Sequence, residues 1–337
     1  MDLESLHIVA PVSSEDEIKK VINAGADELY CGAMFDDWVS VFGDADLISR
    51  RQSKMSHINN PKTLSRVARL ASDNGCNIAL TLNVGYSLVQ EQAVLDLVKL
   101  WEDVGGTSVL VSDLSLLLAL QKRNSSLKRH LSILTGVFNS MSVKFFLQTG
   151  ISRVVLPRHL SLNEVKALTK EEGKIEYEML VMNQKCQFID SMCGFYHGVH
   201  LPSEIPAQFD YEFVPGEQKY VSNFHDPDYE GHACQLEYKT DSGTVQHICI
   251  DDYHMPHCAA CSLLDLLDAD VRFLKIAGRG YPVDMITRSI RFISDSINIY
   301  KKTNGKDNII YNIKELYSKT FGQPCKNKKC YYTLKEL

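Results

Sequence analysis

The sequence has no apolar segment long enough to cross a membrane as a helix. Such a helix needs roughly 18 or more consecutive apolar residues, and charged residues interrupt every apolar stretch of this 337-residue chain. The first segment, MDLESLHIVAP, also lacks the basic start and long apolar run of a secretory signal. We therefore expect a cytoplasmic protein with no membrane span.

Positive charge is scarce as well, because 36 Lys and Arg face 42 Asp and Glu, for a net charge of −6. This balance argues against a generally basic surface that coats nucleic acid, so no DNA partner is expected, but a local basic patch is compatible with it. The motifs HExxH and GxSxG are absent too. Their absence argues against the zinc peptidases and serine hydrolases that carry them.

The chain does contain a repeated alternation of short apolar runs and helical patterns. We expect strands at 7–11, 28–33, 77–84, 108–113, 130–136, 152–157, 174–182 and 272–277. Strands that alternate with helices form parallel βαβ units. Eight such units favour a closed TIM-type (β/α)8 barrel over an open sheet with a separate small domain at 183–256.

This fold defines the predicted domain organisation. The barrel covers residues 1–305, and it includes a Cys-rich insertion at 183–260 between the seventh and eighth strands. Residues 306–337 form a short C-terminal appendage.

Polar residues stand at or just after the ends of predicted strands, where active sites of such barrels are found. They are Asn83, Asp113, Thr135, Arg158, Asn183 and Arg279. Each one could simply cap a helix or contact a loop. Because all six are expected at the same mouth, together they predict a pocket.

Of the six cysteines between the predicted seventh and eighth strands, Cys249 lies in an apolar alternation typical of a strand, and the other five are candidate metal ligands. They are Cys186, Cys193, Cys234, Cys258 and Cys261. Thiolates grouped at the mouth of a barrel suit an iron–sulfur cluster or zinc, and the histidines of the same segment could complete a zinc site. Spacing alone does not choose between the two metals. The remaining interpretation is that they are inert buried cysteines.

A further pair, Cys325 and Cys330, lies near the C-terminus in the segment CKNKKCYY. These two cysteines could fasten the tail, join a metal site or stay free. The pattern does not decide among these roles.

Six segments, in order along the chain, are similar to one protein family. They are IVAPVSSEDEIKKVINAGADELYCGA, TLNVGY, VLVSDLSLL, SRVVLPRHLSLNEV, EYEMLVMNQKCQFIDSMC and DADVRFLKIAGRG. In the fifth and most specific segment, Glu178 stands eight residues before Cys186, and Cys193 follows seven residues later. With these segments the chain resembles the collagenase-like peptidases, peptidase family U32, from about residue 7 to about residue 300.

The resemblance implies a barrel that holds a [4Fe-4S] cluster through four cysteines, with zinc as the runner-up. It makes Cys186 and Cys193 the first two ligands and Cys234 the third, and it leaves Cys258 and Cys261 as alternatives for the fourth. Members of the family serve oxygen-independent or prephenate-linked hydroxylation of RNA bases or of ubiquinone precursors. The family's usual His–Gly pair is Met182–Asn183 here, and its usual acidic residue in the eighth strand is Ala277.

The preferred hypothesis is an iron–sulfur enzyme for oxygen-independent hydroxylation, or a related redox modification, of an RNA base, a peptide or a quinone precursor. The residues predicted to act in catalysis are Glu178, Arg158 and Asn83. The residues predicted to bind substrate are Arg51, Asp113, Thr135 and Arg279. The arginines would hold a phosphate or carboxylate, and Glu178 would accept a proton or pair with an arginine.

Two other functions stay open. One is the peptidase activity that the family name suggests. The other is a non-catalytic role as the iron–sulfur partner of another protein or of a homologous subunit.

Overall fold

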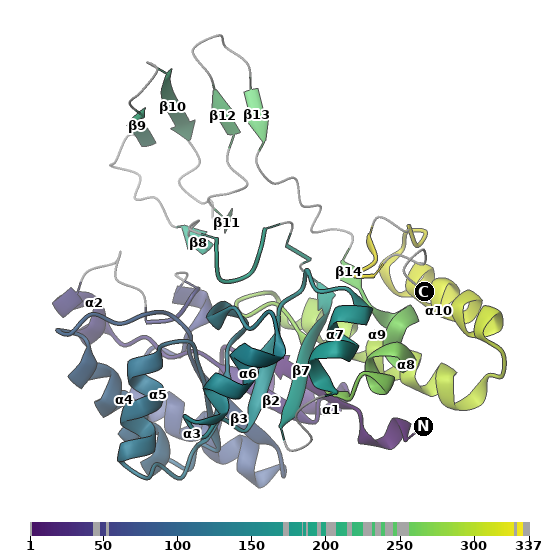
Figure 1. Ribbon diagram of the computed structural model, residues 1–337, viewed down its shortest axis with the longest axis horizontal. Coiled ribbons are helices and arrows are strands. Elements are labelled where there is room, and N and C mark those ends of the chain that lie inside the picture. Colours follow the sequence, from purple (N-terminus) through teal and green to yellow (C-terminus); the bar gives the residue numbers. More distant parts are fainter. Residues whose placement is uncertain are drawn as a thin grey trace.

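The computed structural model describes residues 2–42, 48–51, 54–170, 175–183, 185, 186, 188–193, 256–326 and 329–332. Between residues 197 and 247 it describes the backbone of the short strands β8 to β13. Figure 1 shows the whole arrangement.

Eight parallel strands close into a barrel, which confirms the TIM-type (β/α)8 fold. They are β1 (His7–Pro11), β2 (Glu28–Cys31), β3 (Asn77–Leu82), β4 (Ser108–Val111), β5 (Lys128–Leu131), β6 (Arg153–Leu156), β7 (Glu176–Asn183) and β15 (Val271–Ile276). Each strand pairs in parallel with the next one. The last strand, β15, closes the ring because it pairs with both β7 and β1.

Helices connect the strands and surround the barrel (Figure 1). They are α1 (Glu15–Asn23), α2 (Asp36–Phe42), α3 (Pro61–Asp73), α4 (Glu91–Asp103), α5 (Leu114–Lys122), α6 (Ser140–Leu147), α7 (Leu162–Thr169), α8 (Leu263–Asp268), α9 (Val283–Lys302) and α10 (Lys306–Phe321). Short 3₁₀ helices are η1 (Leu3–Ser5), η2 (Lys54–Ser56), η3 (Ile133–Thr135) and η5 (Ala260–Ser262). None of the helices in the described part of the chain is both long and apolar enough to cross a membrane.

Local sequence explains where several helices begin. Asn60 caps α3 by accepting a hydrogen bond from the backbone N–H of Thr63, and Pro61 occupies the first turn, where its missing N–H costs nothing. Ser161 and Glu164 form a reciprocal capping box at the start of α7. The capping box of α7 ends the loop that follows β6 at residues 157–161, so α7 begins close to the mouth of the barrel.

The barrel strands are buried on both faces, as parallel strands covered by helices usually are. Alternate side chains such as Ile8, Leu29 and Ile78 belong to the large core that the helices share. Their neighbours along the strands point inward, where Val9, Tyr30, Ala79 and Phe273 form a small separate apolar cluster. The polar residues of the interior, described below, lie around this cluster.

The fifth strand differs from the prediction of 130–136. It begins two residues earlier, at Lys128, and ends at Leu131. Ser132 ends it because its side chain accepts a hydrogen bond from the backbone N–H of Leu134 and starts η3. Gly136 closes this turn in the left-handed conformation, with φ of 76°.

The insertion leaves the barrel at the end of β7 (Figure 1). Its strands β9 (Ala207–Phe213), β10 (Gln218–Phe224), β12 (Glu237–Lys239) and β13 (Val245–His247) form an antiparallel sheet. Strands β8 (His197–Val199) and β11 (Gly231–His232) form a separate pair. The chain returns through β14 (His257–Cys258), which pairs antiparallel with the last residues of β7.

The residues after the barrel pack against it. Helix α10 lies along α9, and the ring of Phe292 contacts those of Tyr317 and Phe321 at centroid distances of 5.6 and 5.3 Å. The tail then reaches β14, where Cys330 forms a parallel bridge with Cys258. The predicted appendage thus contains a helix that the prediction did not include.

Candidate active site at the mouth of the barrel

A cavity of about 130 Å³ opens at the carboxyl end of the barrel strands. Active sites of (β/α)8 barrels occupy this end. Its lining includes six residues named from the sequence: Arg51, Asn83, Arg158, Cys186, Cys193 and Arg279. Arg50, Asp190 and Lys275 also line it, and sequence reasoning did not select them.

The described lining of this cavity is strongly basic. It contains five cations, which are Arg50, Arg51, Arg158, Lys275 and Arg279. The one carboxylate in the same lining is Asp190. A surplus of positive charge in a concave site attracts anions. The cavity is therefore suited to phosphate or carboxylate groups, which arginine binds through two parallel hydrogen bonds.

Arg158 and Asp190 form an ion pair that holds the Cys186–Cys193 segment against the end of β6. The backbone N–H and Nε of Arg158 donate to Asp190 Oδ2 at 3.0 and 3.1 Å, and Nη2 contacts Oδ1 at 2.5 Å. Burial lowers the pKa of Arg158, but the Asp190 carboxylate outweighs burial and raises it. Arg158 therefore positions the segment that carries the two cysteines.

Arg50 ties the same segment to the end of β3. Its backbone N–H donates to Asn83 Oδ1 at 3.0 Å, and its Nη2 donates to the carbonyl oxygen of Cys193 at 2.9 Å. Its Nε is buried and has no hydrogen-bond partner in the described part of the structure. Arg50 thus has an unused donor beside the cavity.

Arg279 is only 5% exposed, and its hydrogen-bond partners among the described residues are uncharged. Its Nη2 donates to Ser49 Oγ at 2.9 Å and its Nη1 to the carbonyl oxygen of Ser56 at 3.5 Å. Burial lowers the pKa of this guanidinium to about 10, so it stays charged at neutral pH. A buried cation with only neutral partners has the most to gain from a bound anion.

Gly32, at the end of β2, makes room for this arginine. A Cβ at position 32 would lie 1.8 Å from Arg279 Nη1 and 2.9 Å from His57 Cδ2. No other residue type fits there unless the guanidinium moves. The requirement is steric, since the φ angle of Gly32 is not in the left-handed region.

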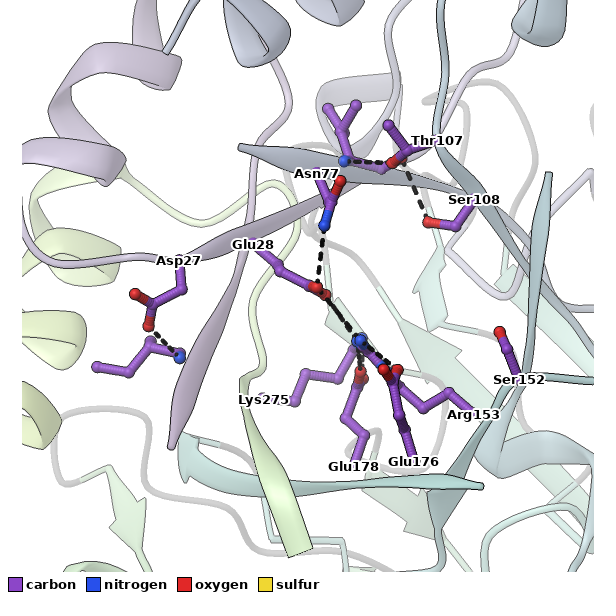
Figure 2. Close-up of polar contacts among 12 residues, drawn as sticks. Asp27, Glu28, Asn77, Thr107, Ser108, Ser152, Arg153, Glu176, Glu178 and Lys275 are labelled. Carbon is purple, nitrogen blue, oxygen red and sulfur yellow. Dashed lines mark hydrogen bonds and ion pairs between the residues drawn. The ribbon is translucent and has the colours of Figure 1, made fainter. Parts of the chain in front are cut away.

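Beneath the cavity, a column of charged side chains fills the interior of the barrel (Figure 2). Arg153, from β6, donates to Glu28 of β2 at 2.7 Å, to Glu176 at 2.9 Å and to Glu178 at 3.0 Å. Lys275 Nζ donates to the other oxygen of Glu178 at 2.6 Å. Because β2 and β6 are not neighbours in the sheet, the contact between Glu28 and Arg153 must cross the interior of the barrel.

Glu178 lies in this column and not in the described lining of the cavity. Burial raises the pKa of its carboxyl, but Lys275 and Arg153 outweigh burial and lower the pKa to about 2. A carboxylate that is ionised at all ordinary pH values and fully occupied by two cations is a poor proton acceptor. Its geometry is that of a residue that positions Lys275, which does line the cavity.

The cysteines divide into two groups. Cys186 and Cys193 line the mouth cavity, and Cys186 Sγ accepts a hydrogen bond from the N–H of Phe188 at 3.4 Å. Burial raises the pKa of the Cys186 thiol, while the nearby charge of Arg158 opposes the shift. Cys258 and Cys261 lie in β14 and η5 and do not line the cavity. Cys234 lies outside the described residues.

The donors at the mouth fit a thiolate-bound metal group. Two thiols face one cavity, and cationic side chains surround them, which suits thiolates and an anionic cluster. Over the residues that the structure describes, no three Cys, His, Asp or Glu side chains already form a metal-binding group. The [4Fe-4S] cluster and its zinc alternative therefore stay predictions.

Asp113 and Thr135 lie outside the described lining of the cavity. Asp113 caps α5 through the N–H of Leu116 at 2.8 Å and also accepts from the N–H of Tyr86 at 3.0 Å. Thr135 is part of η3, and its hydroxyl is buried with no hydrogen-bond partner among the described residues. The geometry gives Asp113 a capping role.

Two of the residues that sequence reasoning missed carried a visible signal. Lys275 is a charged residue in the middle of the apolar strand segment RFLKIA, where only a paired or functional lysine is tolerated. Asp190 stands between Cys186 and Cys193. Arg50, by contrast, is adjacent to Arg51 in an irregular segment, and nothing in the pattern distinguishes the two.

The curated relatives of this chain include archaeal and bacterial proteins. An uncharacterized protease of Methanocaldococcus jannaschii is 25% identical over 325 residues, which are 92% of this chain and 70% of that protein. The tRNA hydroxylation protein P of Haemophilus influenzae is 26% identical over 149 residues, 43% of this chain. The tRNA hydroxylation protein P1 of Bacillus subtilis is 22% identical over 189 residues, 55% of this chain. The matches cover 27% and 40% of these two proteins.

Among solved structures, the structure of a U32 peptidase is similar to this one over 52% of this chain and 68% of the peptidase chain. The sequence identity is 13% and the TM-score is 0.41. The sequence model of Peptidase family U32 matches residues 13–335. This match covers nearly the whole chain and agrees with the segments quoted above. The chain belongs to peptidase family U32.

Proposed function

We propose that this chain is an iron–sulfur enzyme that modifies an RNA base by oxygen-independent hydroxylation. One observation carries the proposal, namely that two thiols and a surplus of arginine and lysine side chains line a single cavity at the mouth of the barrel. The tRNA hydroxylation proteins among its relatives supply the substrate class and the type of reaction.

Cys186 and Cys193 would hold the cluster, together with Cys234 from the insertion and a fourth ligand. When bound, an iron–sulfur cluster supplies one-electron chemistry that no amino-acid side chain offers. The ion pair of Arg158 with Asp190 and the contact of Arg50 with Cys193 fix the thiols in place. These two arginines therefore act through the cysteine segment.

The substrate would bind through its negative charge and its base. Arg51 and Arg279 face the cavity and are suited to hold phosphate oxygens. Apolar side chains of the same lining, among them Leu110, Val155 and Leu180, would receive a base that has left its stack. Lys275, held by Glu178, would place a fixed donor at the floor of the cavity.

The test combines metal content with RNA analysis. The full chain purified without oxygen should be brown and contain about four irons with matching sulfide, and Cys186→Ser should lose both. Cys76→Ser is the matched control, because Cys76 lies before β3, at the opposite end of the barrel. A colourless protein that binds only zinc would overturn the cluster.

The second arm compares modified nucleosides in transfer RNA from cells that lack this protein. Cells complemented with the wild type or Cys76→Ser should regain a hydroxylated nucleoside, and cells with Cys186→Ser or Arg279→Gln should not. An unchanged nucleoside profile would overturn the RNA substrate. Peptide hydrolysis by the purified protein that survives in Cys186→Ser would support the peptidase alternative, which has only the family name in its favour.

A further inference from the structure

Four cysteines from two distant segments meet beside the end of β7. Cys258 and Cys261 form a C-x-x-C in β14 and η5, and Cys325 and Cys330 follow α10. None of the four belongs to the described lining of the mouth cavity. The proposed function leaves their grouping unexplained.

Backbone geometry joins the two segments. Cys258 and Cys330 are partners in a parallel bridge, and the N–H of Tyr331 donates to the carbonyl oxygen of Cys258 at 2.9 Å. Residues paired across such a bridge turn their side chains to the same face. The two thiols therefore project side by side.

Other contacts fix the elements that carry the cysteines. Tyr300 of α9 donates its hydroxyl to the carbonyl oxygen of Ala260 at 3.0 Å, inside the C-x-x-C turn. Tyr317 of α10 donates to the carbonyl oxygen of Pro256 at 2.8 Å. Helix α10 also packs against η5, the short helix that contains Cys261.

Burial and the neighbouring cysteines both affect the pKa of these thiols. Burial raises the pKa of Cys261 to about 12, and Cys330 and Cys325 add to this shift. The pKa of Cys258 is also raised by burial first, and then by Cys261, Cys330 and Cys325. Cys258 is only 7% exposed, and the other three are partly buried.

We propose that Cys258, Cys261, Cys325 and Cys330 bind one Zn²⁺ in a structural site that fastens the C-terminal segment to the barrel. Structural zinc takes four ligands, and its ligand pairs are typically separated by two to four residues. C-x2-C and C-x4-C both have this spacing. Each segment supplies two thiolates, which closes the coordination sphere and leaves no open position for a substrate.

Two lysines offset the negative charge of zinc with four thiolates. Lys185 Nζ donates to the carbonyl oxygens of Cys330 and Tyr331 at 3.1 and 2.5 Å. The charge of Lys314 opposes the rise in the pKa of Cys261, Cys325 and Cys330. In the described residues the thiols do not form a metal-binding group, so the proposed site requires their side chains to move when zinc binds.

The proposal also bears on the cluster at the mouth. It assigns to zinc both cysteines that were alternatives for the fourth cluster ligand, Cys258 and Cys261. Cys186, Cys193 and Cys234 then stay as the predicted thiolates of the mouth. The two sites can be tested separately because they share no ligand.

The experiment measures zinc, iron and sulfide in the full chain purified without oxygen. We expect about one zinc per chain, and the double variant Cys325→Ser/Cys330→Ser should lose it while any iron stays. Cys186→Ser should keep the zinc, and Cys76→Ser should match the wild type. Loss of iron instead of zinc in the double variant would overturn the proposal, and so would retention of zinc.

A second measurement uses the wild-type chain, in case the double variant does not fold. N-ethylmaleimide should label the four cysteines only after a zinc chelator is added, as read by peptide mass spectrometry. Labelling that a chelator does not change, or a disulfide between Cys258 and Cys330, would overturn the zinc site. A chain without iron would contradict the proposed function. The zinc content and the N-ethylmaleimide labelling would still test the zinc site in that case.

Discussion

Lys275 Nζ lies 2.6 Å from Glu178 Oε1, and Arg153 Nη1 donates to Glu178 Oε2 at 3.0 Å. One carboxylate, 1% exposed, therefore balances two cations from two other strands inside the barrel. Lys275 also lines the mouth cavity, so this pair connects the charged interior to the candidate site. Figure 2 shows how the side chains converge.

Replacing Glu178 with Gln should reduce the free energy of unfolding by about 3–5 kcal/mol, because it leaves two buried cations without their shared counter-charge. Urea denaturation monitored by circular dichroism measures the change. Glu176→Gln is the matched control, since Glu176 also pairs with Arg153 but its side chain is 40% exposed. Glu176→Gln should reduce the free energy of unfolding by at most about 1 kcal/mol. Equal losses in the two variants would contradict the role of Glu178 as the buried counter-charge of Lys275 and Arg153.

The acid sensitivity of the fold should depend on the same residue. Burial raises the pKa of Glu178, but Lys275 and Arg153 lower it to about 2, against about 4.3 in an unfolded chain. A depressed pKa stabilises the fold above the unfolded value, and this contribution is lost as pH falls from about 4.3 to about 2. The stability difference between wild type and Glu178→Gln should therefore be constant above about pH 5 and shrink below it. A difference that stays constant down to about pH 2.5 would argue against an ionised Glu178.

Asp190→Asn should loosen the segment from Cys186 to Cys193. It removes the charged partner of Arg158 but keeps the side-chain size. Backbone amides in this segment should exchange with deuterium at least about tenfold faster, since a loss of about 1.4 kcal/mol in local stability has that effect. Asp270→Asn serves as the control, because Asp270 pairs with Arg272 at an exposed position. Unchanged exchange at 188–193 would show that Arg158 does not hold the segment.

Gly32→Ala should displace Arg279 and impair the site. The new Cβ would stand 1.8 Å from Nη1, and overpacking of this kind typically costs about 1–3 kcal/mol. The melting temperature should fall, and under the proposed function nucleoside hydroxylation should fall with it.

Gly85→Ala is the control for this change, because a Cβ there meets only Asp113 Oδ2 at 3.8 Å. It should leave the melting temperature and the hydroxylation almost unchanged. A Gly32→Ala protein that behaves like Gly85→Ala would show that Arg279 has room to move.

Much of the architecture was predictable because the information is local. Apolar runs and helix patterns alternate along the chain, and β1 begins and ends at the predicted residues, 7 and 11. Strand β5 was misplaced, since the hydroxyl of Ser132 competes with strand pairing and starts a 3₁₀ turn. Helix α10 was missed, although Ile309, Ile313 and Tyr317 recur at helical spacing on its buried side.

The sequence by itself determined the barrel, the position of its mouth and the residues that follow each strand, because β/α periodicity and strand direction are properties of neighbouring residues. Only the tertiary structure decided which of these residues face the same cavity. Glu178 and Lys275 are 97 residues apart in the chain, and Arg153 and Glu28 are 125 apart. Cys330 meets Cys258 for the same reason, since closure of the barrel and the packing of α10 bring together segments whose pairing no local pattern encodes.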